Sequence, residues 1–251
     1  MKRVISFFYT IYLFVGATIY VFVYGGIVLM IGGLLRLFSK NLSKKFVVKQ
    51  IETFGRMAFK LLGIKVYKFG EISKTDNNFL IVSNHQSALD IPLVIGYVTP
   101  AAFIAKKELA KVPGINWYLK YLNSVLIDRG NIRQTAAALK EVVKRLRRGV
   151  HFIIFPEGTR SEDGKVLSFK PRSLELAFKY KVKVLPVSIW GLHRVWKKKR
   201  FLIERHPVYI KIHDFIDPKD FNSEEELRIH VENVIKEGVE FLERRHYSEE
   251  S

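Results

Sequence analysis

The chain of 251 residues contains no cysteine. This excludes a disulfide scaffold, a thiolate-based zinc or iron–sulfur site and a thiol nucleophile. Acidic residues are scarce too: 24 Asp and Glu stand against 42 Lys and Arg, giving a formal net charge of +18. That balance predicts an anionic partner, which is a nucleic acid, an anionic lipid or a phosphorylated substrate. The sequence also lacks an internal repeat, a Walker-type glycine loop and a cluster with metal-ligand spacing, so we expect neither a metal nor a cofactor.

Residues 4–35 carry no formal charge and are strongly apolar. One helix of that length measures ~48 Å, which is too long for an upright span of a ~30 Å bilayer core and too short for two spans. Glycine pairs at 25–26 and 32–33 offer places to turn, and Lys and Arg flank both ends, as on a cytoplasmic side. We predict a monotopic, membrane-embedded helical hairpin over residues 1–40, on the cytoplasmic face of the plasma or inner membrane. A single tilted span and a secretory signal are the alternatives.

Residues 42–62 have the apolar spacing of an amphipathic helix. Glu52 is the only acid among the first seventy residues, which hold eleven Lys and Arg. Such a helix could lie on an anionic membrane surface or pack on the domain that follows. We therefore divide the chain into a membrane segment (1–40), a linking helix (41–63) and an α/β domain (64–251).

Short β-branched runs alternate with helical patterns from residue 64 onward. Strands are predicted at 64–69, 79–83, 101–105, 125–127, 152–155, 182–189 and 208–212. Helices are predicted at 132–148, capped by Asn131, at 171–180, beginning with Pro171, and at 223–245, beginning with a capping box. The alternation predicts an α/β fold with a mixed, largely parallel sheet flanked by helices.

His85 and Asp90 follow the predicted strand 79–83, five residues apart. The carboxyl end of a strand is the usual ligand-binding edge of an open α/β sheet. A carboxylate beside an imidazole fixes its tautomer and stabilises the imidazolium, which would make His85 a general base. Ser87 and Asp90 also have the spacing of a capping box, so a purely structural role for Asp90 stays open.

A second polar stretch follows the predicted strand 152–155 and contains Glu157, Gly158, Thr159 and Arg160. Gly158 permits a turn whose amides are free, and Arg160 provides a bidentate cation, so the stretch suits a phosphate monoester. Glu157 could orient Arg160 or a substrate hydroxyl. The alternative is an ordinary polar turn with a solvated Arg160.

Three further features complete the candidate set. Lys106 and Arg129 follow two other predicted strands and are candidate phosphate ligands at the same edge. Pro186 interrupts an apolar strand, which we expect to lie at an edge of the sheet or to be broken there. The residues at 190–200 combine Trp190 and Trp196 with several Lys and Arg, which favours a membrane surface over a nucleic acid once the apolar N-terminus is considered.

These blocks, taken in order, resemble the glycerolipid acyltransferase family, most closely its lysophosphatidic acid acyltransferases. The resemblance covers residues 64–212 and rests on four blocks of sequence: Asn84-His85-x4-Asp90, Arg129 in Ile-Asp-Arg, Phe155-Pro156-Glu157-Gly158-Thr159-Arg160-Ser161 and Leu185-Pro186-Val187. One departure is Pro171-Arg172 after Lys170, where relatives often have a Lys-Gly helix start.

The resemblance implies an acyl transfer that gives phosphatidic acid. His85, oriented by Asp90, would act as base on the sn-2 hydroxyl of 1-acyl-sn-glycerol 3-phosphate, which attacks the thioester of acyl-CoA or acyl-carrier protein. Phosphate binding maps onto residues 157–160, helped by Lys106 and Arg129, and Pro186 belongs to the acyl-donor block. The expected partners are these substrates and anionic membrane lipids, without nucleic acid. The alternatives are another glycerol phosphate or lysophospholipid acceptor, a histidine-based hydrolase and a non-catalytic binding module.

Overall fold

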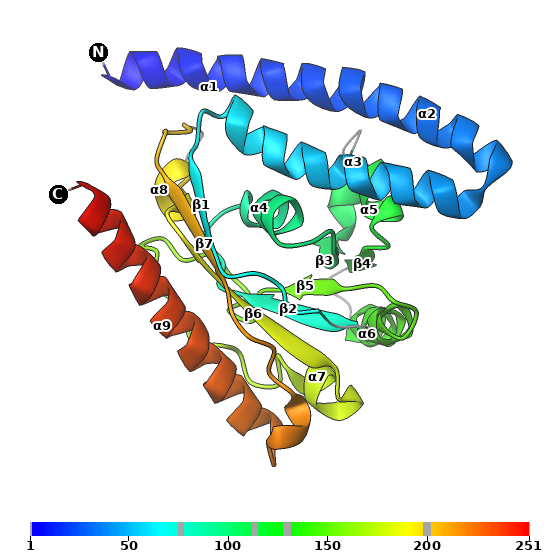
Figure 1. Ribbon diagram of the computed structural model, residues 1–251, viewed down its shortest axis with the longest axis vertical. Coiled ribbons are helices and arrows are strands. Elements are labelled where there is room, and N and C mark those ends of the chain that lie inside the picture. Colours follow the sequence, from blue (N-terminus) through cyan, green and yellow to red (C-terminus); the bar gives the residue numbers. More distant parts are fainter. Residues whose placement is uncertain (1, 75–77, 112–114, 128–131, 198–201, 251) are drawn as a thin grey trace.

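A computed structural model describes residues 2–74, 78–111, 115–127, 132–197 and 202–250. Within these ranges one seven-stranded sheet has the order β1-β7-β6-β2-β5-β3-β4 (Figure 1). Its strands are β1 (Val66–Phe69), β2 (Phe79–Ser83), β3 (Ala102–Lys106), β4 (Val125–Ile127), β5 (Phe152–Ile154), β6 (Lys183–Trp190) and β7 (Val208–Ile212). All neighbouring strands are parallel except β6 and β7, which confirms a mixed, largely parallel sheet.

Pro186 does not lie in an edge strand, contrary to one of the two expectations. Its strand β6 is central, pairing with β2 on one side and β7 on the other. The ladder to β7 begins only at Val187, while Val184 forms an isolated bridge with Ile216. Pro186 therefore lies where this ladder is interrupted. Because no regular ladder hydrogen bond is expected at that position, the missing N–H of proline leaves none unmade.

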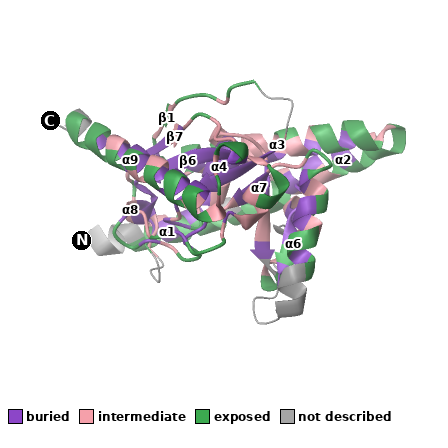
Figure 2. Cartoon of the chain, turned by 90° about the horizontal axis from the view of Figure 1, so that it is seen from below, coloured by how far each residue is buried: buried purple, intermediate pink, exposed green. Residues whose placement is uncertain are grey.

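Helices cover both faces of the sheet around two separate hydrophobic cores (Figures 1 and 2). On one face lie α3 (Lys40–Leu61), α4 (Asp90–Tyr97), α5 (Ile115–Tyr121) and α8 (Leu192–Val195). On the other lie α6 (Ile132–Leu146), α7 (Glu175–Tyr180) and α9 (Glu224–Glu250). Short turns of 3-10 helix cover Lys107–Lys111 and Pro218–Asp220. Because the helices cover the two faces, the site lies at the polar ends of the strands.

The expected hairpin within residues 1–40 is not formed. Instead, α1 (Lys2–Ile19) continues through a π-helical turn (Tyr20–Tyr24) into α2 (Gly25–Phe38). The stretch Phe7–Phe38 is long and apolar enough to cross a membrane. The chain reverses only at Ser39, whose Oγ accepts a hydrogen bond from the Leu42 amide and caps α3. One glycine of each pair allows close packing rather than a turn: a Cβ on Gly32 would lie 2.7 Å from Val47, and one on Gly25 would lie 2.7 Å from Tyr118 Oη.

The other predicted helices differ at their ends. The helix expected from Pro171 begins only at Glu175, because Arg172 adopts a positive φ of 63° that breaks the first turn. Helix α6 ends before Gly149, which has a positive φ of 89°, and its predicted cap Asn131 lies outside the described residues. At α9 one half of the predicted capping box forms, since Ser223 Oγ accepts from the Glu226 amide at 3.1 Å, while the Glu226 carboxylate accepts from the Asn222 amide at 2.9 Å instead of from that of Ser223.

Two glycines set the distance between α3 and α4. A Cβ on Gly55 would lie 2.6 Å from the Pro92 carbonyl, and one on Gly96 would lie 2.7 Å from the Arg56 amide. We expect Gly55→Ala and Gly96→Ala each to lower the free energy of unfolding by about 1–3 kcal/mol, because backbone must move. Gly33→Ala is the matched helical control, since a Cβ there meets nothing within 4 Å. Denaturant titration in detergent measures the difference; equal stability of Gly55→Ala and Gly33→Ala would contradict this packing.

Candidate active site

Two loops meet at the carboxyl edge of the sheet. Residues 84–90 follow β2 and residues 155–161 follow β5, and these strands are parallel neighbours. The Ser161 amide donates to the His85 carbonyl at 2.8 Å, and the His85 amide donates to Glu157 Oε1 at 3.2 Å. The structure thus brings together the two stretches that the sequence singled out.

The Asp90 carboxylate organises the first loop. Its Oδ2 accepts hydrogen bonds from the amides of Gln86 (2.7 Å) and Ser87 (2.9 Å) and lies 2.6 Å from His85 Nδ1. Asp90 is fully buried at the start of α4. The sequence left two roles open for Asp90: closing the turn and orienting His85. In the structure one oxygen atom has both roles.

The geometry fixes how the His85 ring presents its nitrogens. Because a carboxylate oxygen only accepts, Nδ1 donates to Asp90 and Nε2 keeps a free lone pair. The ring stacks on Phe155, with 4.3 Å between the centroids. The side chain remains 22% exposed, so a reactant can approach it. A neutral imidazole held in this way is equipped to take a proton at Nε2.

Asn84 and Gln86, on either side of His85, anchor the loop to the end of β6. Asn84 exchanges two hydrogen bonds of 2.8 Å with the backbone of Ile189, as a strand residue would. Gln86 Nε2 donates to the carbonyls of Ile189 (2.9 Å) and Gly164 (3.0 Å). Sequence reasoning missed these structural roles, for which the only signal was their position beside His85.

Glu157 is buried in the second loop, where its Oε1 accepts the His85 amide. Among the described residues its Oε2 has no hydrogen-bond partner. Burial, helped by the nearby Asp90 and Glu232 carboxylates, raises the pKa of Glu157 from 4.5 to about 8. The side chain is therefore mostly protonated at pH 7, and it adds no full negative charge to the site.

The cationic side chains are only partly described. Gly158 has a positive φ of 68°, and a Cβ on it would lie 2.6 Å from Lys170 Nζ, so Lys170 lies across the turn. Thr159 is exposed and Arg160 half-buried beside it. Lys106 ends β3, next to β5, but its side chain is outside the described part, and Arg129 lies wholly outside it.

The expected membrane role of Trp190 is wrong, because its side chain is buried at 2% exposure against Tyr209 and His246. Trp196 is half-buried and packs edge-on against Phe14 of α1, with centroids 6.1 Å apart. Residues 198–200 lie outside the described residues. This segment thus packs against the N-terminal helix through Trp196, and it does not expose two tryptophans to a membrane surface.

Comparisons with known proteins identify the family of this chain. A family model described as "Acyltransferase" matches residues 64–190. The 1-acyl-sn-glycerol-3-phosphate acyltransferase of Borreliella burgdorferi is 34% identical over 160 residues, covering 62% of this chain and 64% of that protein. The one of Cocos nucifera is 31% identical over 183 residues, covering 72% and 58%. The matched stretch thus spans less than two thirds of either relative.

A solved structure covers nearly the whole chain. The crystal structure of the 1-acyl-sn-glycerophosphate (LPA) acyltransferase PlsC from Thermotoga maritima superposes with a TM-score of 0.89 and 48% sequence identity. The superposition covers 97% of this chain and 98% of that one. The apolar N-terminal helix therefore belongs to the shared architecture.

The raised pKa of Glu157 predicts a pH-dependent stability. Between pH 4.5 and about 8 the folded chain keeps this proton and the unfolded chain loses it. The free energy of unfolding should fall across that interval by at most ~1.4 kcal/mol per pH unit, and Glu157→Gln should flatten the slope. Denaturant titrations at several pH values measure it, with Glu162→Gln, an exposed neighbour, as control. An unchanged slope in Glu157→Gln would mean that Glu157 is ionised throughout.

Proposed function

The chain belongs to the acyltransferase family, and we propose that it transfers an acyl chain from a thioester donor to the sn-2 hydroxyl of 1-acyl-sn-glycerol 3-phosphate, giving phosphatidic acid. The observation that carries the proposal is the 2.6 Å contact between His85 Nδ1 and Asp90 Oδ2 at a partly open sheet edge. The names of the relatives support the acceptor, and the donor is acyl-CoA or acyl-carrier protein.

In the proposed reaction His85 Nε2 removes the proton of the acceptor hydroxyl as its oxygen attacks the thioester carbonyl carbon. The carbon–sulfur bond then breaks, and the imidazolium returns the proton to the departing thiolate. Asp90 stabilises the imidazolium and keeps Nδ1 protonated, so Nε2 alone exchanges protons. A well-placed base of this kind contributes about 10²–10⁴-fold to the rate. Zero Cys excludes a thiol acyl-enzyme.

The acceptor phosphate is proposed to bind at the turn after β5. The Thr159 hydroxyl and Arg160 are the proposed donors for phosphate oxygens, whereas the Gly158 amide already donates to the Phe155 carbonyl at 3.1 Å. A mostly protonated Glu157 suits this role, because an ionised carboxylate would repel the phosphate. Lys106 and Arg129 are further proposed ligands at this edge. Pro186, buried in β6 beside β2, is proposed to shape the donor region.

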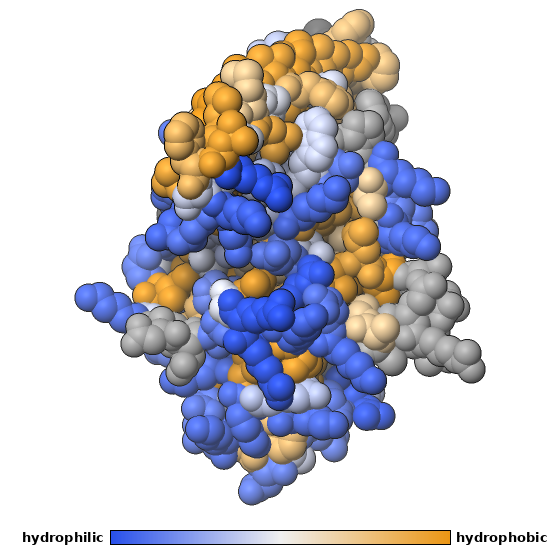
Figure 3. Space-filling view, turned by 90° about the vertical axis from the view of Figure 1, so that its right-hand side faces the viewer, coloured by the Kyte–Doolittle hydropathy of each residue, from blue (hydrophilic) through white to orange (hydrophobic). Residues whose placement is uncertain are grey.

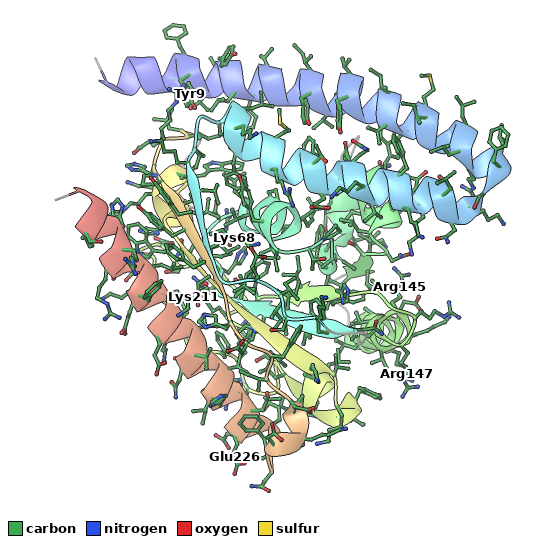
Figure 4. The ribbon with its side chains drawn as sticks, viewed as in Figure 1. Tyr9, Lys68, Arg145, Arg147, Lys211 and Glu226 are labelled. Carbon is green, nitrogen blue, oxygen red and sulfur yellow. The ribbon has the colours of Figure 1, made fainter. Side chains whose placement is uncertain are left out.

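The continuous helix α1–α2 is proposed to lie along the membrane in one leaflet. One face contacts the rest of the chain toward both ends of the helix: Tyr9 Oη donates to the Leu62 carbonyl at 2.7 Å (Figure 4), and Ser43 Oγ donates to the Gly32 carbonyl at 2.7 Å. The opposite face is apolar and exposed, at Phe8, Ile11, Tyr12, Val15, Ile19, Phe22, Val23, Ile27, Met30, Leu34 and Leu37. If the helix crossed the bilayer upright, the lysines of α3, which packs beside it, would lie in the hydrocarbon core. Burying their charges there would cost much free energy. The positive flanks support a cytoplasmic location for this surface.

Replacement of the proposed base tests the mechanism. We expect His85→Ala to lose acyl transfer by at least about 10²–10⁴-fold, and Asp90→Asn to lose it as well, because the ring is no longer oriented. The assay follows labelled lysophosphatidic acid with donors of graded chain length. His230→Ala, an exposed histidine on α9, is the control, and vesicle binding should survive in every variant. Normal turnover of His85→Ala would overturn the mechanism.

Single engineered cysteines test the orientation of α1–α2, since the chain has no cysteine that would be labelled in error. Polarity-sensitive labels at Phe8→Cys, Phe22→Cys and Leu37→Cys should report similar, shallow depths in vesicles. Lys45→Cys should report water. A label at position 22 near the bilayer centre, with the other two at opposite surfaces, would instead establish a tilted span.

A further inference from the structure

The reversal from α2 to α3 borders an open hollow of about 190 Å³ against α5, which we call the elbow pocket. It is lined by Arg36, Lys40, Ser43, Lys44, Lys120, Tyr121 and Asn123. None of these residues belongs to the candidate active site. Asn123 precedes β4, so the pocket adjoins the end of that strand opposite to the catalytic edge.

The charges of the elbow pocket are uncompensated. Four of its lining residues are cations and none is an acid. In the part of the chain that the structure describes, none of the four cations forms an ion pair. Lys40 and Lys44 also occupy the first turns of α3, where carboxylates are the stabilising choice, and that helix has no acid in its first turn. The chain thus gathers like charges at a cost to its own stability, which an anion would offset.

The surroundings of the pocket indicate the kind of anion. Leu34, Leu37, Phe38 and Leu42, all beside the reversal, are 56%, 81%, 86% and 50% exposed. Figure 3 looks at this end of the molecule and shows an apolar cap directly above a hydrophilic band. In the proposed orientation the pocket lies at the level of lipid headgroups, where Lys and Arg meet phosphates.

We propose that the elbow pocket binds the phosphate of an anionic phospholipid, as a second lipid site separate from the one at His85. The hollow of about 190 Å³ has room for a phosphate group and is open to solvent on one side. A free phosphate offers the same chemistry but makes no use of the apolar rim. The inference rests on the proposed membrane orientation and not on the catalytic roles of His85 and Asp90.

Adjacent lysines provide a matched test. Lys44 and Lys45 are both exposed, but only Lys44 lines the pocket. Binding is measured to phosphatidylcholine vesicles with and without phosphatidylglycerol. On the anionic vesicles Lys44→Gln should lose about tenfold or more in affinity, as a charge-assisted hydrogen bond is lost. Lys45→Gln should lose about fivefold at most, the effect of one charge near the surface. All variants should bind the phosphatidylcholine vesicles equally.

Lys120 extends the test, because it reaches the pocket from α5, far away in sequence. The double variant Lys44→Gln/Lys120→Gln should lose less than the product of the single losses, since both lysines share one phosphate. Equal losses in Lys44→Gln and Lys45→Gln, or strictly multiplicative losses, would overturn the site in favour of diffuse attraction. Inorganic phosphate binding to the detergent-solubilised chain as tightly as phosphatidylglycerol would overturn the lipid assignment. Failure to bind any vesicle would overturn the membrane orientation, and the pocket with it, but not the catalytic roles.

Discussion

A single oxygen atom, Asp90 Oδ2, holds the candidate active site together. It accepts the Gln86 and Ser87 amides and lies 2.6 Å from His85 Nδ1, so it closes the turn after β2 and orients the imidazole at the same time. Burying a carboxylate is costly unless donors compensate its charge, and here all the donors meet Oδ2, while Oδ1 has no hydrogen-bond partner among the described residues. The donors are the groups that must be held in place. The chemistry therefore depends on the local fold of seven residues.

The second loop depends on the first through Glu157. Its carboxyl group accepts the His85 amide, while the Ser161 amide donates to the His85 carbonyl. Because Glu157 is buried near Asp90, it is mostly protonated, which lets two carboxyl groups share one small site. Around this centre, the close approach of Gly55 to Gly96 brings α3 and with it the membrane-facing helix against the domain. The catalytic edge and the lipid surface are thus tied by backbone packing.

The sequence predicted all seven strands, because buried strands between turns have a strong local signal. It also predicted that His85 would meet Asp90, since both follow one strand closely. The N-terminal hairpin was wrong because glycine spacing alone does not separate a turn from a close contact: Gly25 and Gly32 lie inside α2, and Gly32 packs against Val47. Trp190 was misplaced because composition does not reveal burial. The bond from His85 to Glu157 joins loops that are distant in sequence, and only the sheet order brings them together.

The central claim is that His85 activates an acceptor hydroxyl and not water. The most direct measurement follows the fate of the acyl group of a labelled thioester, with the wild-type chain in vesicles, with and without lysophosphatidic acid. Phosphatidic acid formed only when the acceptor is present, with little free fatty acid in its absence, is the predicted result. Rapid release of fatty acid regardless of the acceptor would identify a hydrolase and contradict the account.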